Sequence, residues 1–229
     1  MPAVNELPTL LAEEVIERVK ELNTTVIADA LSNDAVMDYE IKSVTKKSKV
    51  VGTAITVDLG PGDNLFLHQA IYSGQEGYVL VVDGKDFKEN AYLGELMAFA
   101  ARARGIEGII IDGLVRDKEV LETLELPIFA KGFIPSGPSK DGPGEINIPI
   151  MCGGVSVEPG DLVIGDEDGV VIVPKDKIQD ALAGAEKKMA YENDRLIVLE
   201  KYENNDNPEE IITLEPSWLK EKIKSSLDN

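Results

Sequence analysis

Two stretches carry residues that could perform chemistry on a small acid. The first is the dipeptide Arg116-Asp117, which follows a buried apolar strand and a turn. Arginine offers a fork of N–H donors to a carboxylate or enolate, and aspartate offers a hard oxygen ligand to a divalent cation. The second, Gly94-Glu95-Leu96-Met97, is typical of a turn that opens a helix, where free N–H groups and the positive dipole end attract an anion. Together they predict a site for a metal-chelated carboxylic acid.

The spacing of the two stretches permits them to share one cleft. Twenty residues separate Glu95 from Arg116. If the predicted helix 93–104 and strand 108–112 form one αβ unit, the start of the helix lies beside the end of the strand. Ligands of open α/β sheets usually bind at the carboxyl ends of the strands. A structural interpretation stays open at this point, because Asp117 can equally cap the helix that follows it.

The composition narrows the class of partner. The chain has 229 residues with 42 acidic and 23 basic side chains, a net charge of -19, which argues against nucleic acid or an anionic membrane as the main partner. Its one cysteine, Cys152, rules out an internal disulfide, and its one histidine, His68, rules out a histidine-rich zinc site within one chain. The N-terminus has no signal pattern, and no apolar run approaches membrane-spanning length. We therefore expect a cytoplasmic protein.

The elements that must position the site follow an α/β rhythm. Strands and helices alternate between Tyr78 and Lys131, which favours a parallel or mixed sheet. Two helices are expected before it, the first capped by Thr9. The proline- and glycine-rich segment 132–149 predicts a long ordered loop, and short strands are expected in 150–173. Residues 175–203 predict a long helix, with a break near 191–193.

We expect one α/β domain over residues 1–203, because the proline-rich loop 132–149 joins strands that we expect to share one core. The polar tail, residues 204–229, contains apolar clusters around Ile211 and Trp218. These clusters indicate a docking arm rather than a disordered end. Lys131 ends a predicted strand and is interpreted as a surface residue, so no lysine stands in a clear Schiff-base setting.

Several motifs in order resemble the family that contains the regulator of ribonuclease activity A and the 4-hydroxy-4-methyl-2-oxoglutarate aldolases. In that family an acid, twenty residues, Arg-Asp, two residues and a second acid follow one another, and Glu95, Arg116 and Asp117 match the first three positions. The similarity covers roughly 24–175. Further matching stretches are Gly62-Asp63-Asn64-Leu65, Gly142-Pro143-Gly144-Glu145-Ile146-Asn147 and Pro159-Gly160-Asp161.

The resemblance implies a swivelling β/β/α architecture with mixed sheets and flanking helices. It also implies a class II aldolase that uses Mg²⁺ or Mn²⁺, cleaves 4-hydroxy-2-oxo diacids to pyruvate and an oxo acid, and decarboxylates oxaloacetate. By the same resemblance Asp117 binds the metal, Arg116 and Glu95 are catalytic, and the segment Gly94 to Met97 binds the substrate together with Arg116. Trimers or dimers of trimers, with clefts between subunits, are expected.

One departure and two rival functions accompany this assignment. The final acid of the pattern falls on Val120, and the nearest carboxylate is Glu119. Losing that acid leaves one anchor fewer for metal-bound water. The first rival function is a non-catalytic protein that binds and inhibits a ribonuclease, which the acidic surface favours. The second, a methyltransferase, is disfavoured because no glycine-rich strand-to-helix turn occurs near the N-terminus.

Overall fold

The computed structural model describes residues 3–31, 34–204 and 213–228. The chain divides into two compact units, Met1–Ala185 and Glu186–Asn229. The helices are α1 (Glu13–Lys20), α2 (Thr24–Ala30), α3 (Leu65–Ser73), α4 (Glu95–Ala103), α5 (Lys118–Leu121), α6 (Ile178–Glu203) and α7 (Leu219–Leu227). The strands are β1 (Lys42–Ser43), β2 (Val50–Leu59), β3 (Tyr78–Asp83), β4 (Ala91–Leu93), β5 (Gly108–Ile111), β6 (Leu114–Val115), β7 (Ile128–Ala130), β8 (Gly132–Phe133), β9 (Gly144–Ile146), β10 (Ile150–Cys152), β11 (Val155–Val157), β12 (Leu162–Asp166) and β13 (Gly169–Val173).

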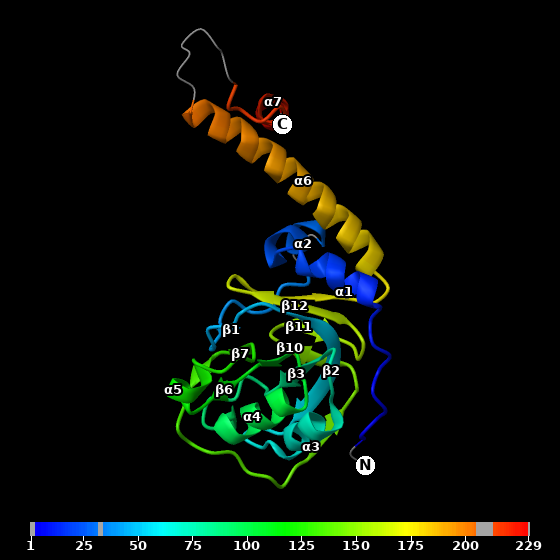
Figure 1. The fold of residues 1–229 in the computed structure, drawn as a ribbon, viewed down its shortest axis with the longest axis vertical. Helices are drawn as coiled ribbons and strands as arrows, with labels where there is room; N and C mark the ends of the chain where they lie inside the picture. The colour runs from blue at the N-terminus through cyan, green and yellow to red at the C-terminus, as the bar shows by residue number, and fades with distance from the viewer. Residues whose placement is uncertain (1–2, 32–33, 205–212, 229) are drawn as a thin grey trace. The chain divides into compact units, whose positions relative to one another are not determined.

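The first unit is built on a mixed eight-stranded sheet (Figure 1). Its strand order is β1-β7-β5-β3-β2-β12-β13, and β9 pairs with the second half of β2. Strands β2, β3, β5 and β7 run parallel, whereas β1, β9, β12 and β13 pair antiparallel. The predicted strand–helix alternation between Tyr78 and Lys131 is therefore confirmed, as is the α/β class with mixed sheets and flanking helices.

Three of the parallel strands are each followed along the chain by a short strand that belongs to a second sheet. Strand β4 follows β3, β6 follows β5 and β8 follows β7, and the three short strands form a parallel sheet in the order β4-β6-β8. The sequence analysis did not find these strands, because two or three residues are too few for an alternating pattern. Strands β8 and β9 also lie inside the segment 132–149 that was expected to be only a loop. Helices α4 and α5 start from this small sheet.

The parallel strands are almost wholly buried and mainly apolar because both faces of the sheet are covered. On one face Ile55, Leu80 and Ile109 pack into a core cluster with residues of α3 and α4. On the other face Ala54 and Val79 join a cluster that contains the β10–β11 hairpin. Figure 1 shows α3 and α4 beside each other below the main sheet. Burial of both faces fixes the main sheet, from whose strands β3 and β5 the chain continues into β4 and β6.

Two helix predictions need correction. Helix α1 begins at Glu13 rather than after Thr9, because Leu11 donates its N–H to the Thr53 hydroxyl at 3.0 Å and the chain up to Ala12 is extended. Helix α6 runs unbroken from Ile178 to Glu203. One asparagine costs a helix interior less than about 1 kcal/mol, which is too little to interrupt a long helix.

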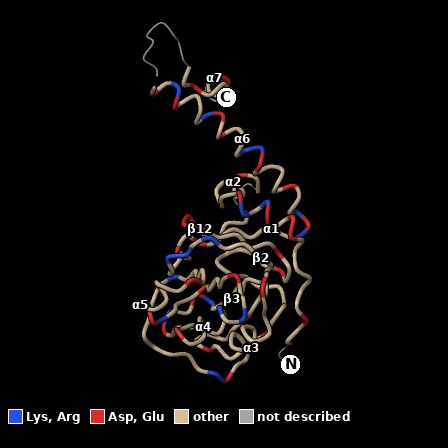
Figure 2. The backbone as a smooth tube through the Cα atoms, in the orientation of Figure 1, with Lys and Arg blue, Asp and Glu red and all other residues tan. Residues whose placement is uncertain are grey.

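The second unit contains the later part of α6 and the predicted tail 204–229, of which residues 205–212 and Asn229 lie outside the described residues. In its described part the Trp218 indole N–H donates to the Tyr191 hydroxyl at 3.0 Å. Across the described residues, no helix combines the length and the hydropathy needed to cross a membrane. Acidic and basic residues are interspersed along the chain (Figure 2).

Candidate active site

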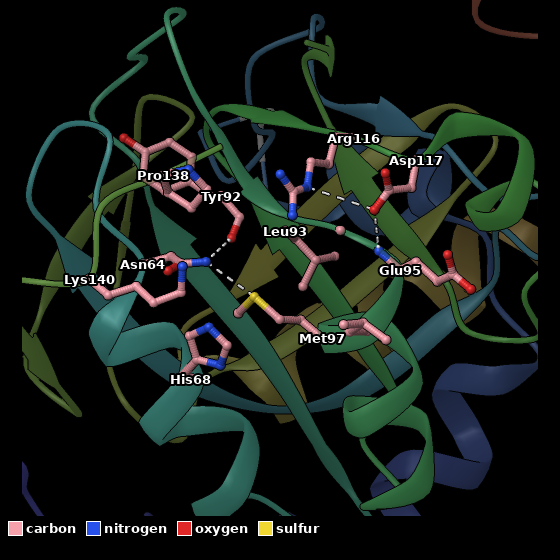
Figure 3. A pocket seen from close by; sticks show the side chains of 12 residues that line it. Asn64, His68, Tyr92, Leu93, Glu95, Met97, Arg116, Asp117, Pro138 and Lys140 are labelled. Atoms are coloured by element: carbon pink, nitrogen blue, oxygen red, sulfur yellow. Dashed lines mark hydrogen bonds and ion pairs between the residues drawn. The ribbon is translucent and has the colours of Figure 1, made fainter. Parts of the chain in front are cut away.

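The predicted site residues line one pocket with a volume of about 470 Å³. The pocket is lined by twelve residues, which Figure 3 shows as sticks: Asn64, His68, Tyr92, Leu93, Gly94, Glu95, Leu96, Met97, Arg116, Asp117, Pro138 and Lys140. Each residue predicted to bind substrate or metal or to act in catalysis belongs to this set. Neither Val120 nor Glu119 does, so the carboxylate beside the missing family acid does not take its place.

Strand pairing in the small sheet brings the two predicted stretches together. Strands β4 and β6 are parallel with Leu93 opposite Val115, so both chains leave the sheet at the same edge. The Arg116 N–H donates to the Leu93 carbonyl oxygen at 2.9 Å and closes this edge. The site therefore lies at the carboxyl ends of β4 and β6, one short strand beyond the position that the sequence analysis expected.

Asp117 joins the two stretches through its side chain. Its Oδ2 accepts a hydrogen bond from the Glu95 N–H at 2.8 Å and lies 3.7 Å from the Arg116 Nε (Figure 3). Its backbone is left-handed, with φ 62° and ψ 45°, a conformation that Asp tolerates better than most residues. The Glu95 N–H therefore binds Asp117 and is not free for a ligand in this arrangement, while substrate binding by the segment Gly94 to Met97 stays a prediction.

The remaining N–H donors at the start of α4 belong to residues that line the pocket. The first hydrogen bond within the helix runs from the Ala98 N–H to the Gly94 oxygen at 3.1 Å, so the Leu96 and Met97 N–H groups have no acceptor within the helix. The Arg116 side chain is 44% exposed and that of Asp117 is 39% exposed, so both are open to a ligand. The pocket end that holds Arg116 combines a guanidinium, a carboxylate and a helix start.

Gly94 is required by the close approach of these groups. A Cβ atom on Gly94 would lie 2.5 Å from the Asp117 Oδ2 and 2.9 Å from the Arg116 Nε. Contacts this short do not occur in folded proteins, so a larger residue would displace both side chains. The glycine therefore serves close approach rather than an unusual backbone angle.

The opposite end of the pocket was missed by the sequence analysis. It is formed by Asn64 and His68 of the α3 region and by Lys140 (Figure 3). Burial lowers the pKa of His68, and the nearby positive charge of Lys140 lowers this pKa further, so both favour the neutral imidazole. Lys140 itself forms no ion pair with any described residue. This end therefore presents an unpaired ammonium beside a neutral imidazole.

Asn64 connects this end to the start of α4. Its Nδ2 donates to the Tyr92 carbonyl oxygen at 2.9 Å and lies 3.1 Å from the Met97 Sδ. The residue is 2% exposed, and its Oδ1 has no hydrogen-bond partner among the described residues. The signal that could have identified it was the stretch Gly62 to Leu65, which the sequence analysis used only for the resemblance. In the structure Asn64 holds α3 against the β4–α4 turn.

The residues present suit a magnesium-type cation rather than a zinc-type one. Within the described ranges 3–31, 34–204 and 213–228, no three His, Cys, Asp or Glu side chains are grouped to enclose a metal. Mg²⁺ often binds through only one or two carboxylates and completes its shell with water and substrate oxygens. Asp117 uses Oδ2 for the Glu95 N–H, which leaves Oδ1 for such an ion. The donor set therefore fits a single-carboxylate site.

Lys131 is not a surface residue, contrary to the sequence interpretation. Its side chain is only 5% exposed, and its Nζ lies 2.8 Å from Asp112 Oδ1, 2.9 Å from Asp86 Oδ1 and 3.4 Å from Asp38 Oδ2. Burial alone would lower the pKa of Lys131, but the carboxylates outweigh burial and raise it. A permanently charged amine is a poor nucleophile, so Lys131 gives no support to a Schiff-base mechanism.

Comparison with known proteins places the chain in a family. The family described as RraA-like (Aldolase/RraA) matches residues 24–172, so the chain belongs to the RraA-like family. A protein of Halalkalibacterium halodurans named "Putative 4-hydroxy-4-methyl-2-oxoglutarate aldolase" is 38% identical over 177 residues, which cover 77% of this chain and 84% of the relative. The resemblance inferred from the motifs is thereby confirmed.

Solved structures share the fold. An uncharacterized protein from Pseudomonas syringae has a TM-score of 0.75 and 25% identity, with 88% of this chain and 95% of that chain covered. The RNA-processing inhibitor RraA from Thermus thermophilis has a TM-score of 0.62 and 29% identity, with 66% and 92% covered. The family thus contains proteins named for aldolase activity and proteins named for inhibition of RNA processing.

Proposed function

We propose that this protein is a divalent-metal-dependent aldolase that cleaves 4-hydroxy-2-oxo diacids to pyruvate and a second oxo acid, and that it also decarboxylates oxaloacetate. The observation that carries the proposal is the joint placement of Arg116, Asp117 and the start of α4 in one pocket. Each group interacts favourably with one part of a 2-oxo acid. The family and its aldolase-named relative support the same reaction class.

Different groups of the pocket would bind different parts of the 2-oxo acid. The N–H groups of Leu96 and Met97 bind the carboxylate next to the ketone, with the dipole of α4 behind them. The Arg116 guanidinium donates to the 2-oxo oxygen. Asp117, together with water molecules, would hold the cation. When bound, that cation supplies Lewis-acid polarisation of the 2-oxo group.

Cleavage places negative charge where Arg116 can stabilise it. The 4-hydroxyl gives its proton to a water molecule and becomes a carbonyl, the C3–C4 bond breaks, and the electron pair of that bond passes into the enolate of pyruvate. The enolate then takes a proton from water at C3 to give pyruvate. A guanidinium positioned before the reaction stabilises the enolate oxygen more than the ketone oxygen, which lowers the barrier. Loss of CO₂ from oxaloacetate produces the same enolate, so the same residues serve both reactions.

The far end of the pocket supports a diacid as substrate. Lys140 places an unpaired ammonium there, and the pKa of the neighbouring His68 is lowered, so no second cation competes with it. A second carboxylate on the substrate would pair with Lys140 while the first lies at the start of α4. A substrate with only one carboxylate would leave this charge unpaired.

An assembly of several copies is part of the proposal. Large apolar side chains on α3 and α4 are exposed, among them Leu96 at 84%, Tyr72 at 61% and Leu65 at 40%. Contiguous exposed apolar surface often marks a protein interface. We expect a trimer or a dimer of trimers, which sedimentation at several protein concentrations would establish.

Inhibition of a ribonuclease is the second candidate, favoured by the likeness to the RNA-processing inhibitor RraA and by the net charge of -19. An acidic protein can mask a basic RNA-binding surface. A panel of 2-oxo acids, assayed for pyruvate release with Mg²⁺, with Mn²⁺ and with EDTA, separates the two. If the protein is an aldolase, we expect turnover that EDTA abolishes and that the substitution Arg116→Ala removes. No turnover on any acid, with Arg116→Ala behaving like wild type, would favour the inhibitor.

A further inference from the structure

One segment runs from beside the Arg116 guanidinium, where a Cβ on Gly137 would lie 3.0 Å from the Arg116 Nη1, to the far end of the pocket, and it is hydrogen-bonded along its length. We call residues Ser136 to Lys140 the strap. The Ser136 carbonyl oxygen accepts from the Ala91 N–H at 2.8 Å, and the Asn90 Nδ2 donates to the Gly137 carbonyl oxygen. The strap carries Pro138 and Lys140 to the pocket wall (Figure 3).

The loop before α3 binds the other end of the strap through its backbone. The Ser139 N–H donates to the Gly62 oxygen at 2.8 Å, and the Asn64 N–H donates to the Ser139 oxygen at 3.1 Å. These two bonds place the strap directly beside the start of α3. That start also supplies Asn64 and His68 to the same end of the pocket.

A buried carboxylate lies at the centre of this contact. Asp63 is 3% exposed, and its Oδ1 accepts from the Leu65 N–H at 2.9 Å, in the first turn of α3. Its Oδ2 accepts from the Ser139 hydroxyl at 2.7 Å and from the Asp141 N–H at 2.6 Å. The carboxylate thus binds α3 with one oxygen and the residues on both sides of Lys140 with the other.

We propose that Asp63 is a positioning residue that holds the strap so that the Lys140 ammonium meets the second carboxylate of the substrate. A lysine side chain is flexible, and its charge selects a ligand only where its backbone is fixed. Asp63 never touches the ligand; it acts through Lys140. The inference rests on the proposed diacid substrate, and it assigns substrate selectivity to a residue outside the pocket lining.

Binding of two unreactive probes tests the positioning role of Asp63 without any turnover. The probes are 2-oxoglutarate and 2-oxopentanoate, which have chains of equal length and differ in a terminal carboxylate against a methyl. Neither has a 4-hydroxyl, so neither can be cleaved by the proposed reaction. Titration calorimetry of the full chain with Mg²⁺ should show wild type preferring 2-oxoglutarate by about 10-fold or more, the effect of one charge-assisted hydrogen bond.

Variants then separate an effect on the position of Lys140 from a general loss of structure. Lys140→Met should abolish the preference, Asp63→Asn should reduce it to the same level, and the double variant should show no further loss. Ser139→Ala removes one of the three donors to Asp63 and should reduce the preference in part. Asp141→Asn is the matched control: it removes a carboxylate next to the strap and keeps the N–H that binds Asp63, so the preference should persist.

Three results would overturn the inference about Asp63. Equal weakening of both probes in Asp63→Asn would show a merely structural role, and additive losses in the double variant would separate Asp63 from Lys140. Lack of any preference in wild type would also overturn the inference. If Asp63→Asn does not fold, Ser139→Ala decides between these outcomes. A preference that behaves as expected in a protein that cleaves no oxo acid would refute the proposed reaction and leave the inference standing.

Discussion

The Asp117 carboxylate accepts the backbone N–H of Glu95 at 2.8 Å, so one side chain both caps the start of α4 and borders the pocket. Two functions of this aspartate can be separated by substitution. Asp117→Asn retains an oxygen acceptor for the Glu95 N–H but no longer carries the charge that a divalent cation needs. We expect at least about a 100-fold loss of metal-dependent turnover with a small change in melting temperature.

Calorimetric titration with Mn²⁺ measures the metal affinity of the same variant, which should fall together with turnover. Glu119→Gln serves as the control, since Glu119 is exposed and lies outside the pocket lining. Unchanged Mn²⁺ affinity in Asp117→Asn would show that the cation binds elsewhere.

Arg116 is expected to act through the geometry of its guanidinium rather than through charge alone. Arg116→Lys keeps the charge but loses the planar fork of donors, so kcat should fall about 100-fold or more while KM changes little. Pyruvate release under saturating substrate measures this. Lys118→Met is a matched control outside the pocket lining. Full activity of Arg116→Lys would indicate that only net charge matters at this end of the pocket.

Gly94→Ala tests the close approach of the Gly94 backbone to the side chains of Asp117 and Arg116. The new Cβ would lie 2.5 Å from the Asp117 Oδ2 and would break its bond to the Glu95 N–H. Turnover should fall at least about 10-fold, because displacement of catalytic groups by about 1 Å commonly costs that much or more. Gly154→Ala is the control for an added methyl, since no atom lies within 4 Å of its Cβ position, although its φ of 77° costs some stability. Normal turnover in Gly94→Ala would mean that the pocket adapts freely.

The pocket end that holds Arg116 and Asp117 was predictable because its residues form short motifs on neighbouring elements of one αβ unit. Glu95 and Arg116 each follow a strand, and parallel strands end at the same edge. The far end depends on contact between α3 and a strap far along the chain, which no local pattern encodes. Lys140 occurs in a loop sequence that resembles any exposed turn, and only the fold places it opposite Arg116.

The fold was predictable where segments were long and apolar. Strands β3 and β5 of the main sheet are buried apolar runs and β2 is rich in β-branched residues, so the order of these strands along the chain was clear. The small sheet was not, because β6 and β8 have two residues each. Lys131 was misjudged for a related reason: its burial is set by Asp112 and Asp86, which come from other strands and loops.

Removal of the Lys131 charge should destabilise the fold. The ammonium is nearly enclosed, and Asp112, whose side chain is 11% exposed, would lose its counter-charge in Lys131→Met. Breaking one side of a buried ion pair typically costs about 3–5 kcal/mol of unfolding free energy. Urea denaturation at pH 7 measures it. Lys88→Met is the control: the Lys88 side chain is 53% exposed, and exposed pairs contribute about 1 kcal/mol or less. Equal changes in the two variants would contradict the prediction.

Asp63 should also make the unfolding free energy depend on pH in the acid range. Burial raises the pKa of Asp63, but the hydrogen bonds from Leu65, Ser139 and Asp141 outweigh burial and hold the pKa below its usual value of 3.8. The folded state therefore binds fewer protons than the unfolded state near that pH, so stability falls as the pH falls. The contribution is complete above about pH 5 and disappears as the pH drops through the lowered pKa.

The comparison with Asp63→Asn isolates this contribution. At pH 7 the variant should lose about 1–3 kcal/mol, the cost of weakening hydrogen bonds to a buried charged group. The difference from wild type should shrink steadily below about pH 4, because the protonated wild-type side chain then resembles the amide. Urea denaturation at a series of pH values measures it, with Asp141→Asn as the control. A difference that stays constant down to acid pH would show that the ionised form of Asp63 is not what stabilises this contact.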